Sequence, residues 1–183
     1  MGETARPLRA DARRNREKLA AAARETFAED GVAASLEEIA RRAHVGIGTL
    51  YRHFPTREDL FQSVYLDEVD KLCRTAEDLA GRPPFEALAE WLRAFVGYVA
   101  TKRALAEALN HDYALFAGGR DKIHAVARPM LRRAQVSGAA RADVTFDDVI
   151  RLVGGISAVQ VTDEAQRERL IQMALDGLRA PRG

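Results

Sequence analysis

The chain has little cysteine, few aromatic residues and no long apolar run. Its single cysteine, Cys73, excludes an intramolecular disulfide and favours a reducing compartment, so we expect a cytoplasmic protein. The first 16 residues are polar and arginine-rich, which is not the pattern of a secretory signal peptide. The sequence contains no stretch of about 18 apolar residues, so it predicts no membrane span. Four histidines and one cysteine without ligand spacing predict no structural metal. We expect no bound cofactor.

Alternating β-branched runs are also missing, whereas helix-favouring Ala, Leu, Glu and Arg are abundant. Apolar residues recur at helical spacing, and 183 residues that are 47% hydrophobic suffice for a folded core. The sequence therefore predicts an all-α fold with about nine helices. Their approximate ranges are 12–29, 35–43, 47–53, 56–80, 85–102, 104–116, 121–136, 146–161 and 163–178.

Local signals place most of these boundaries. A Ser, Thr or Asp followed three residues later by an acid or amide is a helix-capping pattern. Such pairs are Ser35–Glu38, Thr56–Asp59, Thr145–Asp148 and Asp163–Gln166. The expected stops are Gly31, Pro55, 81–84 and Gly118-Gly119, and a kink is expected at Pro129.

The window 41–57 is rich in positive charge. It holds four arginines and two histidines but no acidic residue, although the chain has 27 acidic residues. Such a local bias is typical of a surface that faces phosphates. Residues 1–11 are expected to form a flexible basic tail, in which arginines either touch phosphates or are merely solvated.

Residues 36–50 read as a helix-turn-helix. Ile39 and Leu50 supply apolar packing, and the small Ala40 lets the two helices cross closely. That crossing would project the short helix that follows Gly46 outward, where it fits a major groove about 12 Å wide.

The run IARRAHVGIGTLYRHFPTREDL, residues 39–60, resembles the tetracycline-repressor (TetR) family of transcriptional regulators, above all in GTLYRHF at 48–54. The resemblance covers about residues 13–65. It implies a DNA-binding domain over 12–55 and a ligand-binding and dimerisation domain over 56–183, joined by the helix 56–80. One departure is His44, at a turn position that often holds Gly; a left-handed backbone there is tolerated by His at some strain.

By match to the family and by charge, we expect a set of residues to contact DNA. The glycines would let backbone N–H groups approach phosphates, Thr49 would contact a base edge, and Tyr51 would reach a phosphate unless it is a partly buried core residue. Leu50 and Phe54 are assigned to the core. The expected DNA contacts are Arg14, Ser35, His44, Gly46, Ile47, Gly48, Thr49, Tyr51, Arg52, His53 and Arg57.

The C-terminal part supplies two further expected surfaces, each with core packing as the alternative. A dimer interface is expected on the last two helices, at Val149, Leu152, Val153, Ile156, Leu170, Ile171, Ala174, Leu175 and Leu178. A pocket for a small-molecule effector is expected at Trp91, Phe95, Tyr98, His111, Tyr113, Phe116, His124 and Met130.

Together these features predict a homodimeric, ligand-responsive regulator that represses transcription from a palindromic operator in double-stranded DNA and is released by a small molecule. A transcriptional activator and a helical ligand-binding protein without DNA binding are the alternatives. No catalytic triad, phosphate loop or metal motif is visible, so we do not expect an enzyme.

Overall fold

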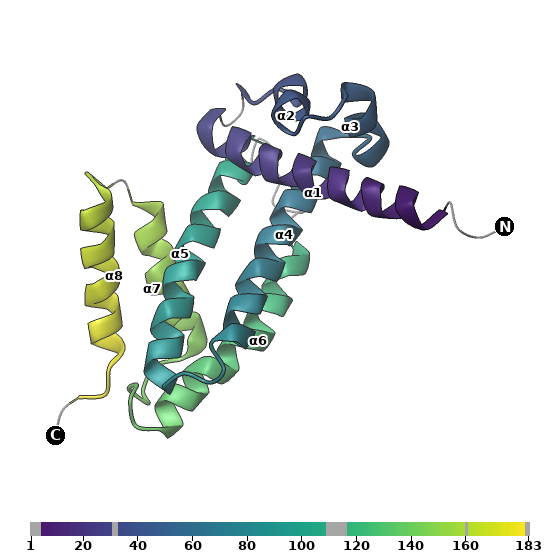
Figure 1. Ribbon diagram of the computed structural model, residues 1–183. Helices are drawn as coiled ribbons and strands as arrows, with labels where there is room; N and C mark the ends of the chain where they lie inside the picture. The colour runs from purple at the N-terminus through teal and green to yellow at the C-terminus, as the bar shows by residue number, and fades with distance from the viewer. Residues whose placement is uncertain (1–4, 31–32, 109–116, 160, 182–183) are drawn as a thin grey trace. The chain divides into compact units, whose positions relative to one another are not determined.

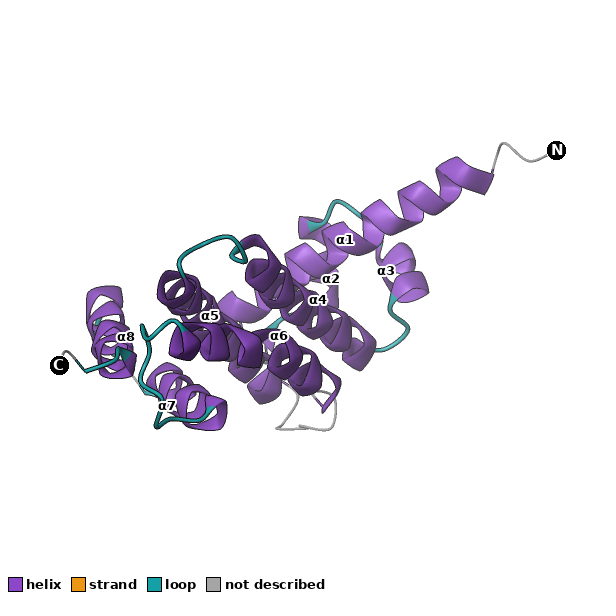
Figure 2. Ribbon diagram, turned by 90° about the horizontal axis from the view of Figure 1, so that it is seen from below, coloured by secondary structure: helices purple, strands orange, loops and turns teal. Residues whose placement is uncertain are grey.

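The computed structural model describes residues 5–30, 33–108, 117–159 and 161–181. In this part of the chain the helices are joined by loops and there is no strand, as Figure 2 shows, which confirms the all-α prediction. Its helices are α1 (Ala5–Asp30), α2 (Leu36–Arg42), α3 (Ile47–His53), α4 (Arg57–Asp78), α5 (Pro84–Ala108), α6 (Ala117–Val136), α7 (Phe146–Ala158) and α8 (Glu164–Leu178).

Several predicted helix ends were wrong. The backbone is already helical from Ala5, where a flexible tail was expected up to residue 11. Helix α5 continues to Ala108 through the expected break near 103, and the rest of the predicted helix 104–116 lies outside the described residues, as does Gly31. Gly118 and Gly119 lie within the first turn of α6 and end no described helix. In α5 the buried Leu105 and Ala106 extend the apolar face beyond residue 103, which favours a continuous helix.

The predicted caps are present where they are purely local. At α7, the Asp148 backbone N–H donates to Thr145 Oγ1 at 3.2 Å, and the Thr145 N–H donates to the Asp148 carboxylate at 2.8 Å. The Thr145 hydroxyl donates to the same carboxylate at 2.6 Å, and this bond and then the one from the Thr145 N–H lower the pKa of Asp148, because they favour its charged form. Thr56 and Asp59 exchange the same pair of bonds ahead of α4, and Asp163 caps α8.

The chain packs as two compact units. The head unit comprises residues 1–67 and 101–116, and the body unit comprises 68–100 and 117–183. Helices α4 and α5 therefore each have one end in the head unit and the other end in the body unit. Among the described residues, no helix is both long enough and apolar enough to cross a membrane.

In the head unit, α1 runs across α2 and α3 (Figure 1). Phe27 of α1 stacks on Phe61 of α4 with ring centroids 4.0 Å apart, and both rings are buried. Leu19, Ile39 and Leu50 of α1, α2 and α3 are fully buried as well. This apolar cluster fixes the position of the short helices α2 and α3, which are too short to be stable alone.

In the body unit, Trp91 of α5 is fully buried. Its indole N–H donates to the Leu72 carbonyl of α4 at 3.1 Å, and its ring stacks on Phe95. The end of α8 is held by an isolated antiparallel bridge between Ala140 and Arg179. The body unit is thus a packed helical bundle with an aromatic centre.

Candidate DNA-binding site

Helix α2 starts at a side-chain cap. Ser35 has an extended backbone, and its hydroxyl accepts a hydrogen bond from the Glu38 N–H at 3.0 Å. This is half of the predicted capping box. The Glu38 carboxylate, expected to return to the Ser35 N–H, is hydrogen-bonded to Arg41 and Arg42 instead.

The turn between α2 and α3 has the predicted strain. His44 has a φ of +54°, in the left-handed region that costs a non-glycine residue some energy. Backbone bonds hold it there: the His44 N–H donates to Arg41 O at 3.1 Å, and the Val45 N–H donates to Ala40 O at 3.0 Å. With Ala40 and Ala43 buried, this turn fixes the angle between the two helices.

Helix α3 is held from one side and open on the other. Leu50 is fully buried, and Phe54, which caps the helix, is almost so. Ile47 and Tyr51 are 38% and 47% exposed, and Gly46, Gly48 and Arg52 are exposed as well; Thr49 and His53 are half-buried. A Cβ built on Gly46 or Gly48 meets no atom within 4 Å, so the open side is smooth and uncovered. The structure therefore brings most of the predicted DNA contacts onto one exposed helix.

Two predicted contacts lie elsewhere or are engaged. The Arg57 guanidinium lies over the rings of Phe27 and Phe61, 5.9 and 5.3 Å from their centroids, so it belongs to the packing of α1 on α4 instead of standing out at the start of α4. Arg14 is ion-paired with Asp11, one turn earlier on α1.

An ion-pair network at α2 was missed. The Glu38 carboxylate accepts hydrogen bonds from Arg41 at 2.7 and 2.8 Å and from Arg42 at 2.7 Å. Arg42 also donates to Glu29, at the end of α1, at 2.6 Å. The spacing of Glu38 from the two arginines, three and four residues, was a readable signal. Two of the window's four arginines are thus neutralised by acids from just outside it.

This pairing makes a testable prediction about acidity. The hydrogen bonds from Arg41 and then Arg42 lower the pKa of Glu38 to about 2, from an ordinary 4.5. Because the folded-state pKa is the lower one, the stabilisation is complete above pH 4.5 and is lost as the pH falls through 2. We expect an NMR titration of the Glu38 carboxyl to have its midpoint near 2 and Arg42→Gln to move it toward 4.5. If the titration midpoint of Glu38 is the same in Arg42→Gln as in the wild type, the Glu38–Arg42 ion pair does not persist in solution.

The end of α3 is anchored by a residue that the sequence did not single out. Arg16 of α1 lies over the Phe54 ring, 4.8 Å from its centroid, and donates to the Ser63 hydroxyl of α4 at 3.4 Å. A recess of about 250 Å³ beside it is lined in part by His53, Asp59 and Gln62. Arg16 thus links α1, the end of α3 and α4 within the head unit.

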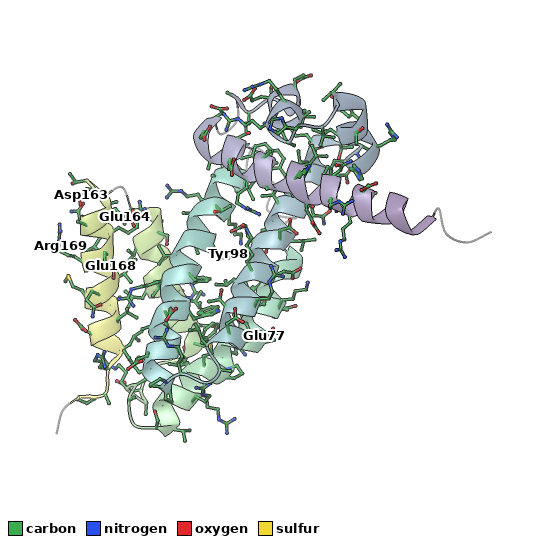
Figure 3. The ribbon with its side chains drawn as sticks, in the orientation of Figure 1. Glu77, Tyr98, Asp163, Glu164, Glu168 and Arg169 are labelled. Atoms are coloured by element: carbon green, nitrogen blue, oxygen red, sulfur yellow. The ribbon has the colours of Figure 1, made fainter. Side chains whose placement is uncertain are left out.

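The expected effector residues form part of the aromatic centre of the body unit. Trp91, Phe95, Tyr98 and Met130 are buried, and His124 lies edge-on to Phe146 at 5.2 Å (Tyr98 is labelled in Figure 3). Two recesses of the body unit, of about 570 and 420 Å³, are lined by other residues, among them Arg141 and Arg82. His111, Tyr113 and Phe116 lie outside the described residues. The effector pocket remains a prediction.

Most of the residues predicted for a dimer surface are buried within one chain. Six of the nine are buried because α7 and α8 pack their apolar sides on the rest of their own unit. These six are Val149, Val153, Ile171, Ala174, Leu175 and Leu178. Leu152 is 50% exposed, and Ile156 and Leu170 are half-buried. Val159 and Met173, which the sequence reading left out, are 57% and 70% exposed.

Two charged neighbours on α8, Glu168 and Arg169, point in different directions (Figure 3). Glu168 accepts from Arg93 of α5 at 3.0 Å, whereas Arg169 lies on the opposite side of the helix (Figure 3). Met173, one turn after Arg169, is on the open side too. The exposed side of the last two helices therefore mixes apolar and charged residues.

Comparison with known proteins extends over both units. The family model for bacterial regulatory proteins of the tetR family matches residues 19–64, and a model for the C-terminal domain of SbtR-like transcriptional regulators matches residues 83–180. An HTH-type transcriptional regulator of Staphylococcus aureus is 39% identical over 64 residues; the match spans 34% of this chain and only about a third, 35%, of that relative's length.

Two solved structures match nearly the whole chain. A TetR transcriptional regulator from Streptomyces coelicolor is 39% identical with a TM-score of 0.81, over 91% of this chain and 99% of that one. A TetR regulatory protein from Mycobacterium vanbaalenii is 35% identical with a TM-score of 0.78, over 95% and 100% of the two chains. The chain therefore belongs to the TetR family of helix-turn-helix transcriptional regulators.

Proposed function

We propose that this regulator is a repressor that binds a palindromic operator through α3. The carrying observation is that Leu50 is fully buried while Ile47, Gly48 and Tyr51 of the same helix are exposed. A helix with one side packed on the protein core and the other side exposed to solvent can enter a major groove. The proposed contacts are the exposed residues of α3 together with Ser35 at the start of α2 and His44 in the turn, both of them exposed.

We also propose that two copies bind together. One seven-residue helix contacts too few base pairs for specific binding, so a two-fold pair reading an inverted repeat is the expected solution. Leu152, Val159 and Met173 support this, because they place large exposed apolar side chains on α7, α8 and the link between them. The proposed interface is this open side of the two helices.

Release by a small molecule is the third part of the proposal. Residues 57–67 of α4 belong to the head unit and residues 68–78 to the body unit, so a ligand that moves the second part also acts on the first. Release requires that the ligand bind the DNA-free conformation more tightly than the DNA-bound one. A ligand with equal affinity for both would leave the operator occupied.

Selection of genomic fragments bound by the full chain is the experiment that tests this. We expect fragments that share an inverted repeat, bound as two copies per repeat, with affinity that falls steeply with salt. Ligands found by thermal stabilisation are then titrated against the operator complex, and a true effector dissociates it. A reporter at the recovered promoter separates repression from activation. Recovery of no enriched fragment would favour a helical ligand-binding protein without DNA binding.

A further inference from the structure

The arginines of α2 are the starting point. Arg41 is bound by both carboxylate oxygens of Glu38, and Arg42 is bound by Glu38 and Glu29 together. Two positive and two negative charges thus form one closed network. The side chain of Arg41 is nevertheless 75% exposed, so it serves no packing role that would require it to stay paired.

The network lies at the end of α2, the helix that precedes α3 in the chain. The Arg41 carbonyl accepts from the N–H of His44 in the turn, and α3 begins only a few residues later, after Gly46. Only residues 43–46 separate α2 from α3, and charges act on one another over about 8 Å at physiological salt. Whether these arginines are paired therefore changes the field that a DNA phosphate meets there.

Free arginines beside a phosphate strengthen binding to every DNA sequence equally. Each phosphate that a cation neutralises releases counterions and steepens the salt dependence of binding by about 0.9 in a log–log plot. Such contacts add no sequence information, so they raise non-specific binding against specific binding. An acid that occupies the arginines has the opposite effect.

We infer that Glu38 is a specificity-determining residue, which holds Arg41 and Arg42 away from DNA phosphates and so limits sequence-independent binding. This rests on the proposed operator binding. The carboxylate is suited to the task, since its pKa of about 2 keeps it charged at any physiological pH. Glu29 adds to the effect by occupying a second edge of Arg42.

The chain offers a matched control for the test. Glu37→Gln removes one negative charge from the same turn of α2, at an exposed position adjacent to Glu38. Glu38→Gln removes the same charge, frees Arg41 and leaves Arg42 held by Glu29. The cap of α2 survives both changes, because Ser35 accepts from the backbone N–H of residue 38 and not from its side chain. Circular dichroism verifies that each variant folds.

Binding of the full chain to a fluorescent duplex of scrambled sequence is measured by anisotropy over a series of salt concentrations. We expect Glu38→Gln to bind roughly threefold to tenfold more tightly than wild type at low salt, with a salt slope steeper by about 1 to 2. Glu37→Gln is expected to change affinity by no more than about twofold, without a change of slope. Adding Arg41→Gln and Arg42→Gln to Glu38→Gln is expected to return both values to those of wild type.

Three outcomes are distinct. If Glu38→Gln and Glu37→Gln behave alike while all proteins bind DNA, the inference is overturned and the proposed function stands. If neither wild type nor any variant binds scrambled or genomic DNA, the proposed function itself fails. If Glu38→Gln does not fold, Glu29→Gln takes its place, with an expected slope change of about half the size, and an unchanged slope in that variant overturns the inference.

Discussion

Replacing Gly48 with Asp is expected to lower operator affinity by more than about a hundredfold while the free protein stays folded. Gly48 lies on the open side of α3, and a Cβ there meets no atom within 4 Å, so the side chain fits in the absence of DNA. In the proposed complex the same carboxylate would face phosphates and base edges. Like-charge contact at such an interface costs several kcal/mol, and about 2.7 kcal/mol already corresponds to a hundredfold.

Two variants control this result. Gly97→Asp makes the same change at an exposed position in α5, where a Cβ also meets nothing within 4 Å, and is expected to leave operator affinity within about twofold. Gly48→Ala is expected to raise the free energy of unfolding by about 0.5–1 kcal/mol, because alanine favours helix, and still to weaken operator binding. Anisotropy and urea denaturation measure the two effects. Unchanged operator affinity in Gly48→Asp would remove α3 from the proposed interface.

Local chemistry explains why the head unit could be predicted so far from the sequence. The caps at Ser35 and Thr56, the left-handed turn at His44 and the buried position of Leu50 depend on residues a few positions apart. Signals of this range are complete within a short motif. The family resemblance over 13–65 depends on the same segment.

Contacts between distant segments explain what the sequence did not predict. Arg42 reaches Glu29, and Arg57 covers the Phe27–Phe61 pair, through packing of α1 on α2 and α4. Charge alone placed Arg57 among the expected DNA contacts and Arg42 in a window expected to face phosphates. In the same way, the apolar stripes of α7 and α8 do not tell which side faces the chain's own core, and six of the nine residues predicted for a dimer surface are buried within one chain.

The largest loss of stability is expected for Trp91→Ala. Trp91 is fully buried, stacks on Phe95 with centroids 5.5 Å apart, and also packs against Phe146. Removing a buried indole loses its transfer free energy and leaves a cavity, which together cost about 3–5 kcal/mol. The Leu72 carbonyl loses its indole donor as well. Such a loss is a large fraction of the stability of an ordinary domain.

Urea denaturation followed by far-UV circular dichroism measures this effect, since Trp91 is the chain's one tryptophan and its removal abolishes that fluorescence signal. All proteins are compared at one concentration, because association would add to the apparent stability. Val136→Ala, at a side chain that is 81% exposed, is expected to change the free energy of unfolding by no more than about 0.5 kcal/mol. Trp91→Phe keeps an aromatic ring but loses the N–H donor, so its cost should fall between those of the other two variants. A loss below about 1 kcal/mol in Trp91→Ala would mean that the body unit is not organised around this indole.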